Sequence, residues 1–388
     1  MTSSQVGTFS PWASGARSSH VGIRLPSFNS LTPVAELPQT PHDFVLAGFG
    51  HVVVVHRGGF SVFDAQTHAL RAHSDGTLSS SGFPLLSAQG VFSAYAEFGF
   101  DGVRTERAPF DPFRPTGGRV WAASLTDTHF AVLAQRPLSG NHDSVLPPSL
   151  TAVAEKVPKA GRYIGEFLAA QQLKNTEGVG AISANGDFVV ATRDRQLLVF
   201  PLPANRQGPS ELSASVRKPL PFTPYDIALI GGKVTLIQAL GSDAANAFSE
   251  QEELAVTDAA NHARWTTSLH WLELSGTETA HVAVPFPVLQ PPVDLDQGRV
   301  LLVGLGFAAV EGNRVVFTHR SERRCLATAS AGGTFALACG AELQIVTRDG
   351  AIRETFKVRD GESITTPPAI GEDGSVWLAT QRALYVAR

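Results

Sequence analysis

Residues 366–388, Thr-Pro-Pro-Ala-Ile-Gly-Glu-Asp-Gly-Ser-Val-Trp-Leu-Ala-Thr-Gln-Arg-Ala-Leu-Tyr-Val-Ala-Arg, carry the pattern that decides the fold. The pattern predicts a short strand, a turn at Asp373-Gly374, an apolar strand, a second turn and a third strand. Glycine supplies the positive φ of a tight hairpin turn, and β-branched and aromatic residues favour strands. The same outline recurs along the chain every 35–50 residues or so, roughly the spacing of a repeat architecture. The sequence therefore predicts an all-β repeat protein.

Eight stretches show a turn followed by a dense β-branched or aromatic run. They begin at Gly50, Gly90, Thr128, Gly186, Gly232, Gly298, Gly333 and Gly374. A β-propeller blade is a four-stranded antiparallel sheet whose inner strands are short and apolar. We therefore expect a single β-propeller of eight blades, or of seven if the run at 128–133 belongs to an insertion.

The last repeat ends after three strands, which would leave an exposed sheet edge. A strand from the other end of the chain is expected to pair beside Leu384–Val386, either Val21–Leu25 or Val34–Leu37. We accordingly divide the chain into a flexible arm at 1–19 and a propeller at 20–388.

Excess residues between the strand runs predict three insertions, near 135–177, 203–221 and 240–265. The first contains Gly161–Gln172 and the last contains Ala244–Ala260, and both stretches have the composition of a short helix. The Pro-rich middle insertion is interpreted as a surface excursion. Long loops in a compact fold often carry function.

Composition disfavours nucleic acid and membrane partners. The chain of 388 residues has a formal net charge of -4 and a pI near 6.3. Its densest basic cluster, Arg320, Arg323 and Arg324, encloses Glu322 and is interpreted as solvated charge rather than as the basic stripe that nucleic acid requires. No stretch is apolar enough for a membrane span and the N-terminus resembles no signal peptide, so a cytoplasmic protein is expected.

The two cysteines, Cys325 and Cys339, flank a predicted hairpin that turns at Ala331-Gly332-Gly333. Folding about Gly332 places them opposite each other on one face of the strand pair. Two interpretations stay open: small buried thiols, or a disulfide, which a cytoplasmic location disfavours.

No motif points to catalysis. The chain lacks the nucleophile elbow, the P-loop and the dinucleotide-binding glycine pattern. His51 and His56 fall on opposite faces of one strand and cannot bind the same ion. Asp294 and Asp296 share a face but are better explained as turn residues. We assign no catalytic residue, no cofactor and no metal.

Aromatic residues in loops suggest a partner surface. The proline-bounded loop Phe110-Asp111-Pro112-Phe113-Arg114-Pro115 combines two aromatics with an arginine, which is typical of interface anchors. Phe110, Phe113, Arg114 and Trp265 are therefore candidate partner-binding residues. Burial between blades is the alternative explanation.

Pro367–Thr380 resembles the quinoprotein-like (PQQ-type) propeller repeat and the related repeat of sensor propellers, and Pro291–Gly304 resembles it in outline. WD40-like repeats share the architecture, but no Trp-Asp pair ends a repeat here. The resemblance implies the fold. Quinoprotein dehydrogenases carry adjacent cysteines, a pattern that Cys325 and Cys339 do not match.

A ring with decorated loops and no catalytic motif favours a non-catalytic scaffold that binds another protein, within a larger bacterial assembly. The alternatives are a propeller enzyme (a lyase, a lactonase or a glycoside-cleaving enzyme) with a polar or metal site at the channel mouth, and a small-ligand sensor.

Overall fold

The structure is a computed structural model. It describes residues 7–9, 23–37, 42–56, 59–74, 85–87, 90–92, 96–107, 119–125, 129–135, 149–159, 162–173, 178–182, 187–192, 195–201, 210–211, 215–241, 265–295 and 298–388.

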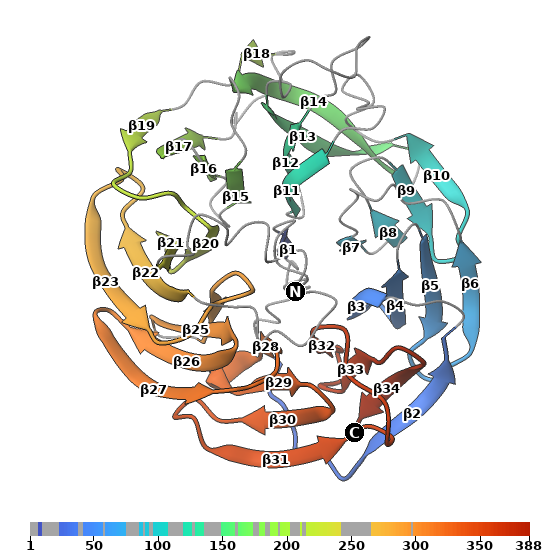
Figure 1. Cartoon of the computed structure of the whole chain (residues 1–388). Coiled ribbons are helices and arrows are strands. Elements are labelled where there is room, and N and C mark those ends of the chain that lie inside the picture. Colours follow the sequence, from blue (N-terminus) through green and yellow to red (C-terminus); the bar gives the residue numbers. More distant parts are fainter. Residues whose placement is uncertain are drawn as a thin grey trace, which may run out of the picture.

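In this described part the protein is all-β apart from one short 3-10 turn, Ala331–Gly333. The strands form eight sheets, seven of them four-stranded and one six-stranded. Figure 1 shows the sheets arranged around a common centre, with the successive strands of each sheet running outward from it. This arrangement of small antiparallel sheets is that of a repeat β-structure and is consistent with a β-propeller.

The strands of the first four sheets come from residues 7–219 and are given in the order of pairing. One contains β3 (His42–Gly48), β4 (His51–His56), β5 (Gly59–Asp64) and β6 (Leu70–Ser74). The next contains β7 (Leu85–Ser87), β8 (Gly90–Phe92), β9 (Ala96–Gly99) and β10 (Arg104–Arg107). The six-stranded sheet contains β1 (Gly7–Phe9), β11 (Arg119–Leu125), β12 (His129–Gln135), β13 (Ser149–Lys159), β14 (Arg162–Leu173) and β18 (Ser210–Glu211). The fourth contains β15 (Gly178–Ile182), β16 (Asp187–Thr192), β17 (Gln196–Pro201) and β19 (Val216–Pro219).

Four more sheets complete the set, again in the order of pairing. The fifth contains β20 (Asp226–Ile230), β21 (Lys233–Leu240), β22 (Thr266–Leu272) and β23 (Glu278–Val284). The sixth contains β24 (Val293–Asp294), β25 (Arg299–Gly304), β26 (Gly306–Glu311) and β27 (Arg314–Arg320). The seventh contains β28 (Cys325–Ala329), β29 (Phe335–Cys339), β30 (Glu342–Val346) and β31 (Ile352–Lys357). The eighth contains β32 (Ala369–Ile370), β33 (Val376–Ala379), β34 (Ala383–Ala387) and β2 (Leu31–Glu36).

Each of the eight predicted runs contains a strand: β4, β8, β12, β16, β21, β25, β29 and β33. In the seven four-stranded sheets this strand is the second in the order of pairing given above, and in the six-stranded sheet β12 is the third. In the run at 128–133, the described residues belong to the strand β12, which pairs with β11 and with β13. The two segments that resemble the quinoprotein-like repeat form the hairpins β24–β25 and β32–β33.

The predicted helix at 161–172 is wrong. Arg162–Leu173 is the strand β14, which pairs with β13 from Lys159↔Arg162 to Ser149↔Leu173. Pairing with this neighbour overrides the helical preference of the Ala, Glu and Gln residues. Most of the first insertion is thus a β-hairpin. The predicted helix at 244–260 lies outside the described residues.

A smaller expectation also changes. The excursion at 203–221 contains β19, the outer strand of the β15–β19 sheet, so only part of it is connection.

The core lies between neighbouring sheets, and β25 shows why its strands are apolar throughout. Val300 and Leu302 pack toward the β20–β23 sheet, while Leu301 and Val303 pack toward the β28–β31 sheet. Successive side chains of a strand point to opposite faces. Since a sheet is buried on both sides, the strand reads as a continuous apolar run.

Residues near the N-terminus lie against the last sheet. β2 is hydrogen-bonded to β34, from Leu31↔Ala387 to Glu36↔Ala383. β2 overlaps Val34–Leu37, the second of the two regions expected to supply this strand. Leu25 and Phe28 just before it are 6% exposed and pack in the core cluster of the last two sheets. Strand β1, within the predicted arm, pairs with β11 near the centre of the ring of sheets (Figure 1).

Candidate functional site

A groove of about 680 Å³ opens between the β24–β27 and β28–β31 sheets. Three segments line it: the end of β27 with the connection to β28, the β29–β30 turn, and the end of β31 with the connection toward β32. β27, β29 and β31 all end at the same edge of their sheets, so the connections that follow these strands lie together there. Connections are free to vary while strands are held by packing, so this edge is where a functional surface is expected.

One wall of the groove comes from the outer strands of the first sheet. The rings of Phe307 on β26 and His319 on β27 stack, with centroids 4.7 Å apart and planes 21° apart. Phe307 is 5% exposed, whereas His319 is exposed. The stacked pair gives this wall an apolar base with a polar edge.

The opposite wall is polar. On β30, Glu342 accepts a hydrogen bond from Gln344 (Nε2 to Oε2, 3.3 Å) and pairs with Lys357 of β31 (Nζ to Oε1, 3.4 Å). Ile352, also on β31, is 48% exposed. An exposed aliphatic side chain at one end of β31 and an ion pair at the other end give this wall the mixed surface found in protein interfaces.

A buried carboxylate marks the far end of the groove. Glu362 is 5% exposed, and its Oε2 accepts hydrogen bonds from the hydroxyls of Thr380 (2.6 Å) and Tyr385 (3.1 Å). Burial raises the pKa of Tyr385, and the hydrogen bond to Glu362 raises it further. Tyr385 therefore stays protonated and donates to Glu362, which holds this carboxylate in one orientation.

Two arginines lie at the rim of the groove, which is the edge formed by the end of β27 and the connection from β27 to β28. Arg320 is the last residue of β27, and Arg323 lies in that connection. Both are exposed, and within the described residues neither is ion-paired. Arg323 crosses the β29–β30 turn so closely that a Cβ on Gly340 would lie 2.6 Å from its Cδ. With Glu322 and Asp360 also exposed, the rim presents both signs of charge.

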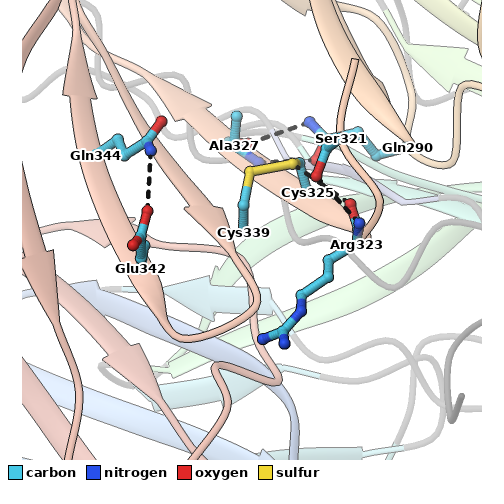
Figure 2. The surroundings of a disulfide bond; sticks show 8 residues. All are labelled: Gln290, Ser321, Arg323, Cys325, Ala327, Cys339, Glu342 and Gln344. Atoms are coloured by element: carbon cyan, nitrogen blue, oxygen red, sulfur yellow. Dashed lines mark hydrogen bonds between the residues drawn. A yellow bond between two sulfur atoms is a disulfide. The ribbon is translucent and has the colours of Figure 1, made fainter. Parts of the chain in front are cut away.

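A disulfide between Cys325 and Cys339 forms part of the wall near the rim, shown in Figure 2 with Arg323 beside it. The predicted register is confirmed: the two residues are direct partners of β28 and β29, with Cα atoms 4.3 Å apart. Of the two open interpretations the bridged one applies, because this register brings the side chains together on one face.

Only one of the predicted partner-binding residues lies in the described part of the chain. Trp265 is 2% exposed, and its ring meets that of Tyr225 edge to face, with centroids 5.0 Å apart. In this conformation Trp265 packs in the core cluster between sheets. Phe110, Phe113 and Arg114 lie outside the described residues, and their role stays a prediction.

Sequence reasoning did find one part of the groove. The sequence marks Arg320, Arg323 and Arg324, which enclose Glu322, as the densest basic cluster, and the pattern predicts solvated charge there. Arg324 departs from that interpretation, since its Nε is buried and burial lowers its pKa to about 10. No local signal linked this cluster to the β29–β30 turn.

Comparisons with known proteins support the fold alone. No family model and no curated protein sequence matches the chain. The computationally designed Ika8 protein is similar in structure, with a TM-score of 0.58 and 10% identity over 94% of this chain and 98% of that one. Raptor of Chaetomium thermophilum has a TM-score of 0.50 and 10% identity. The match covers 94% of this chain but only 29% of Raptor.

Solved structures with this architecture are numerous, 725 matching chains, so the likeness does not select a function. In the described part of the chain, no helix has the length and apolarity needed to span a membrane. No group of three His, Cys, Asp or Glu side chains in that part is arranged to hold a metal ion.

Proposed function

We propose that the protein is a non-catalytic scaffold that binds another protein, and that the groove between the β24–β27 and β28–β31 sheets is its docking surface. The observation that carries this is the lining of the groove: Arg320 and Arg323 are exposed at its edge, and the exposed aliphatic side chain of Ile352 lines the same groove. Arginine is enriched at interface hot spots, and it recognises carboxylates through two parallel hydrogen bonds.

The architecture proposed for this scaffold is an eight-bladed propeller of residues 20–388, closed by the pairing of β2 with β34. Eight sheets in the described part and the likeness to Ika8 support it. Deleting residues 1–37 should lower the thermal midpoint, because the β34 edge loses its partner. An unchanged midpoint would mean that the ring is closed in another way.

Partner capture from the native host tests the groove. We expect the variant Arg320→Glu with Arg323→Glu to lose a partner that the wild type retains, because a carboxylate on the partner is then repelled. Arg217→Glu is the matched control, since Arg217 is exposed on β19 in a different sheet. A photo-reactive residue in place of Ile352 should crosslink the same partner. Retention of every partner by the double variant would reject the groove as the docking surface.

We also propose that the insertions at 135–177 and 240–265 contribute to partner binding, together with Phe110, Phe113 and Arg114. Their separate test is deletion of 244–260 and replacement of both phenylalanines by alanine. Loss of capture in these variants with an intact groove would place the main contact in the insertions.

A small-ligand sensor is the second candidate, and the buried Glu362 favours it. The groove volume is within the range of about 300–1,000 Å³ typical of small-ligand sites. A fixed carboxylate at one end of such a site would orient a cationic or hydroxylated ligand. Thermal stabilisation by a panel of amines and sugars, lost in Glu362→Gln, would support the sensor over the scaffold.

A further inference from the structure

The disulfide divides its two sulfurs between the groove and the core. Cys339 is partly exposed and lines the groove, whereas Cys325 is fully buried in the cluster that joins the β24–β27 and β28–β31 sheets. Cys325 and Cys339 are the only cysteines of the chain. A reagent that enters the groove therefore meets the Cys339 side of the bridge first.

The hairpin that carries the bridge is held by more than the bridge. Beyond it, β28 and β29 continue in register through Leu326↔Ala338 to Ala329↔Phe335. The N–H of Ser330 donates a hydrogen bond to the carbonyl of Thr334. In an antiparallel ladder, hydrogen-bonded pairs alternate with pairs that share no backbone hydrogen bond. Counting from Ser330↔Thr334, the pair Cys325↔Cys339 is one that shares no backbone hydrogen bond. Breaking the S–S bond therefore removes no backbone hydrogen bond of the ladder.

The surroundings suit thiol–disulfide exchange. A Cβ on Gly340 would lie 3.0 Å from Nη1 of Arg323, which places a guanidinium beside the residue that follows Cys339. A positive charge stabilises a thiolate. On the buried side, Sγ of Cys325 lies 3.7 Å from the carbonyl oxygen of Arg323, an acceptor for the S–H that reduction creates.

We propose that Cys325–Cys339 is an exchange site for a dithiol that enters through the groove. The thiolate of the dithiol attacks Sγ of Cys339, the S–S bond breaks, and Cys325 leaves as a thiolate that takes up a proton. The second thiol of the reductant then attacks its own sulfur in the mixed disulfide and releases Cys339. The two protein cysteines are reduced by two electrons, and the dithiol is oxidised to a disulfide.

Reduction changes the groove on its Cys339 side. Two unbonded sulfurs need more separation than two bonded ones, and Cys325 is packed in the core, so the Cys339 side chain is the one that moves. It moves next to Gly340, over which Arg323 lies. Resting on the proposed function, this makes partner binding respond to the redox state.

Two single variants test the direction of access. In Cys325→Ser, the Cys339 thiol should react with an aromatic disulfide reagent as fast as an exposed thiol does. In Cys339→Ser, the Cys325 thiol should react more slowly by about tenfold or more, because a buried thiol is less accessible and forms less thiolate. Equal or reversed rates would overturn attack from the groove.

The wild type tests the exchange itself. After dithiothreitol treatment without denaturant, iodoacetamide should add one carbamidomethyl group, to Cys339, because Cys325 stays buried, and the far-ultraviolet circular dichroism should stay unchanged. Arg323→Ala should slow the reduction severalfold, whereas the control Arg217→Ala should not. Modification that occurs only in urea would show a purely structural bridge, and equal reduction rates in the two arginine variants would remove Arg323 from the site.

Partner capture by oxidised and reduced wild type separates the two proposals. Equal capture in both redox states, with loss in Arg320→Glu and Arg323→Glu, would refute the redox response and keep the docking groove. If the variant with Arg320→Glu and Arg323→Glu also captures the partner as well as the wild type does, the docking groove is refuted. The thiol exchange is then judged by the two experiments above.

Discussion

At the scale of single residues, the segment Asp373–Trp377 shows how a repeat motif becomes a structure. Gly374 has a φ of +82°, which places the turn in the region that favours glycine. The hydroxyl and the backbone N–H of Ser375 both donate to Oδ1 of Asp373. The same hydroxyl oxygen accepts a hydrogen bond from Nε1 of the buried Trp377 at 2.8 Å. The turn and the core side chain are thus linked through one serine.

Ser375→Ala should lower the free energy of unfolding by about 1–3 kcal/mol, because the buried indole N–H of Trp377 loses its acceptor. Urea denaturation followed by tryptophan fluorescence measures this. Ser275→Ala is the control: Ser275 is exposed in the β22–β23 turn and should cost less than about 0.5 kcal/mol. Equal effects of the two substitutions would show that the serine does not link turn and core.

The pH dependence of stability should contain a contribution from Asp373. Burial alone raises the pKa of this carboxyl, but the hydrogen bonds from Ser375 outweigh burial, and the pKa is lowered from 3.8. A lowered pKa in the folded state stabilises the protein above the unfolded pKa, and this stability is lost as the pH falls through the folded pKa.

The comparison is between the wild type and Asp373→Asn, which keeps an acceptor oxygen but no charge. The wild type should have the higher urea midpoint near pH 6, about the pH at which the carboxyl is ionised in both states. Its advantage should shrink as the pH falls below about 4. An advantage that is the same at both ends of this range would contradict the assignment.

At the scale of elements, the final sheet draws its fourth strand from the other end of the chain. β2 contributes the edge strand, and Leu25 and Phe28 before it fill the core cluster of the last two sheets. The backbone N–H of Phe28 also donates to Glu354 on β31 at 3.0 Å. The N-terminal segment therefore contacts two sheets.

Phe28→Ala should lower the free energy of unfolding by about 3–5 kcal/mol, because it leaves a cavity in a packed core. The control is Leu70→Ala on β6, where the side chain is 51% exposed and truncation should cost well under about 1 kcal/mol. Both are measured as midpoints of urea unfolding. A small effect at Phe28 would mean that the N-terminal segment is not part of the core.

At the scale of the whole molecule, all the described sheets lie around one centre (Figure 1). We expect the chain to scatter X-rays as one compact particle, with a radius of gyration of about 21 Å for a single domain of this length. The far-ultraviolet circular dichroism should be dominated by strand. A much larger radius or a helical spectrum would contradict the single-ring proposal.

Local sequence was sufficient for the strand runs and their turns, since the apolar period and glycine positions act over a few residues. It predicted one strand in each of the eight sheets, the hairpin at Cys325–Cys339 and the region that pairs with β34. Only the tertiary structure decided what depends on distant partners. β14 is a strand because β13 lies beside it, and Trp265 is buried because neighbouring sheets cover it. The groove exists because three connections meet where two sheets pack, and no single segment of the chain carries that information.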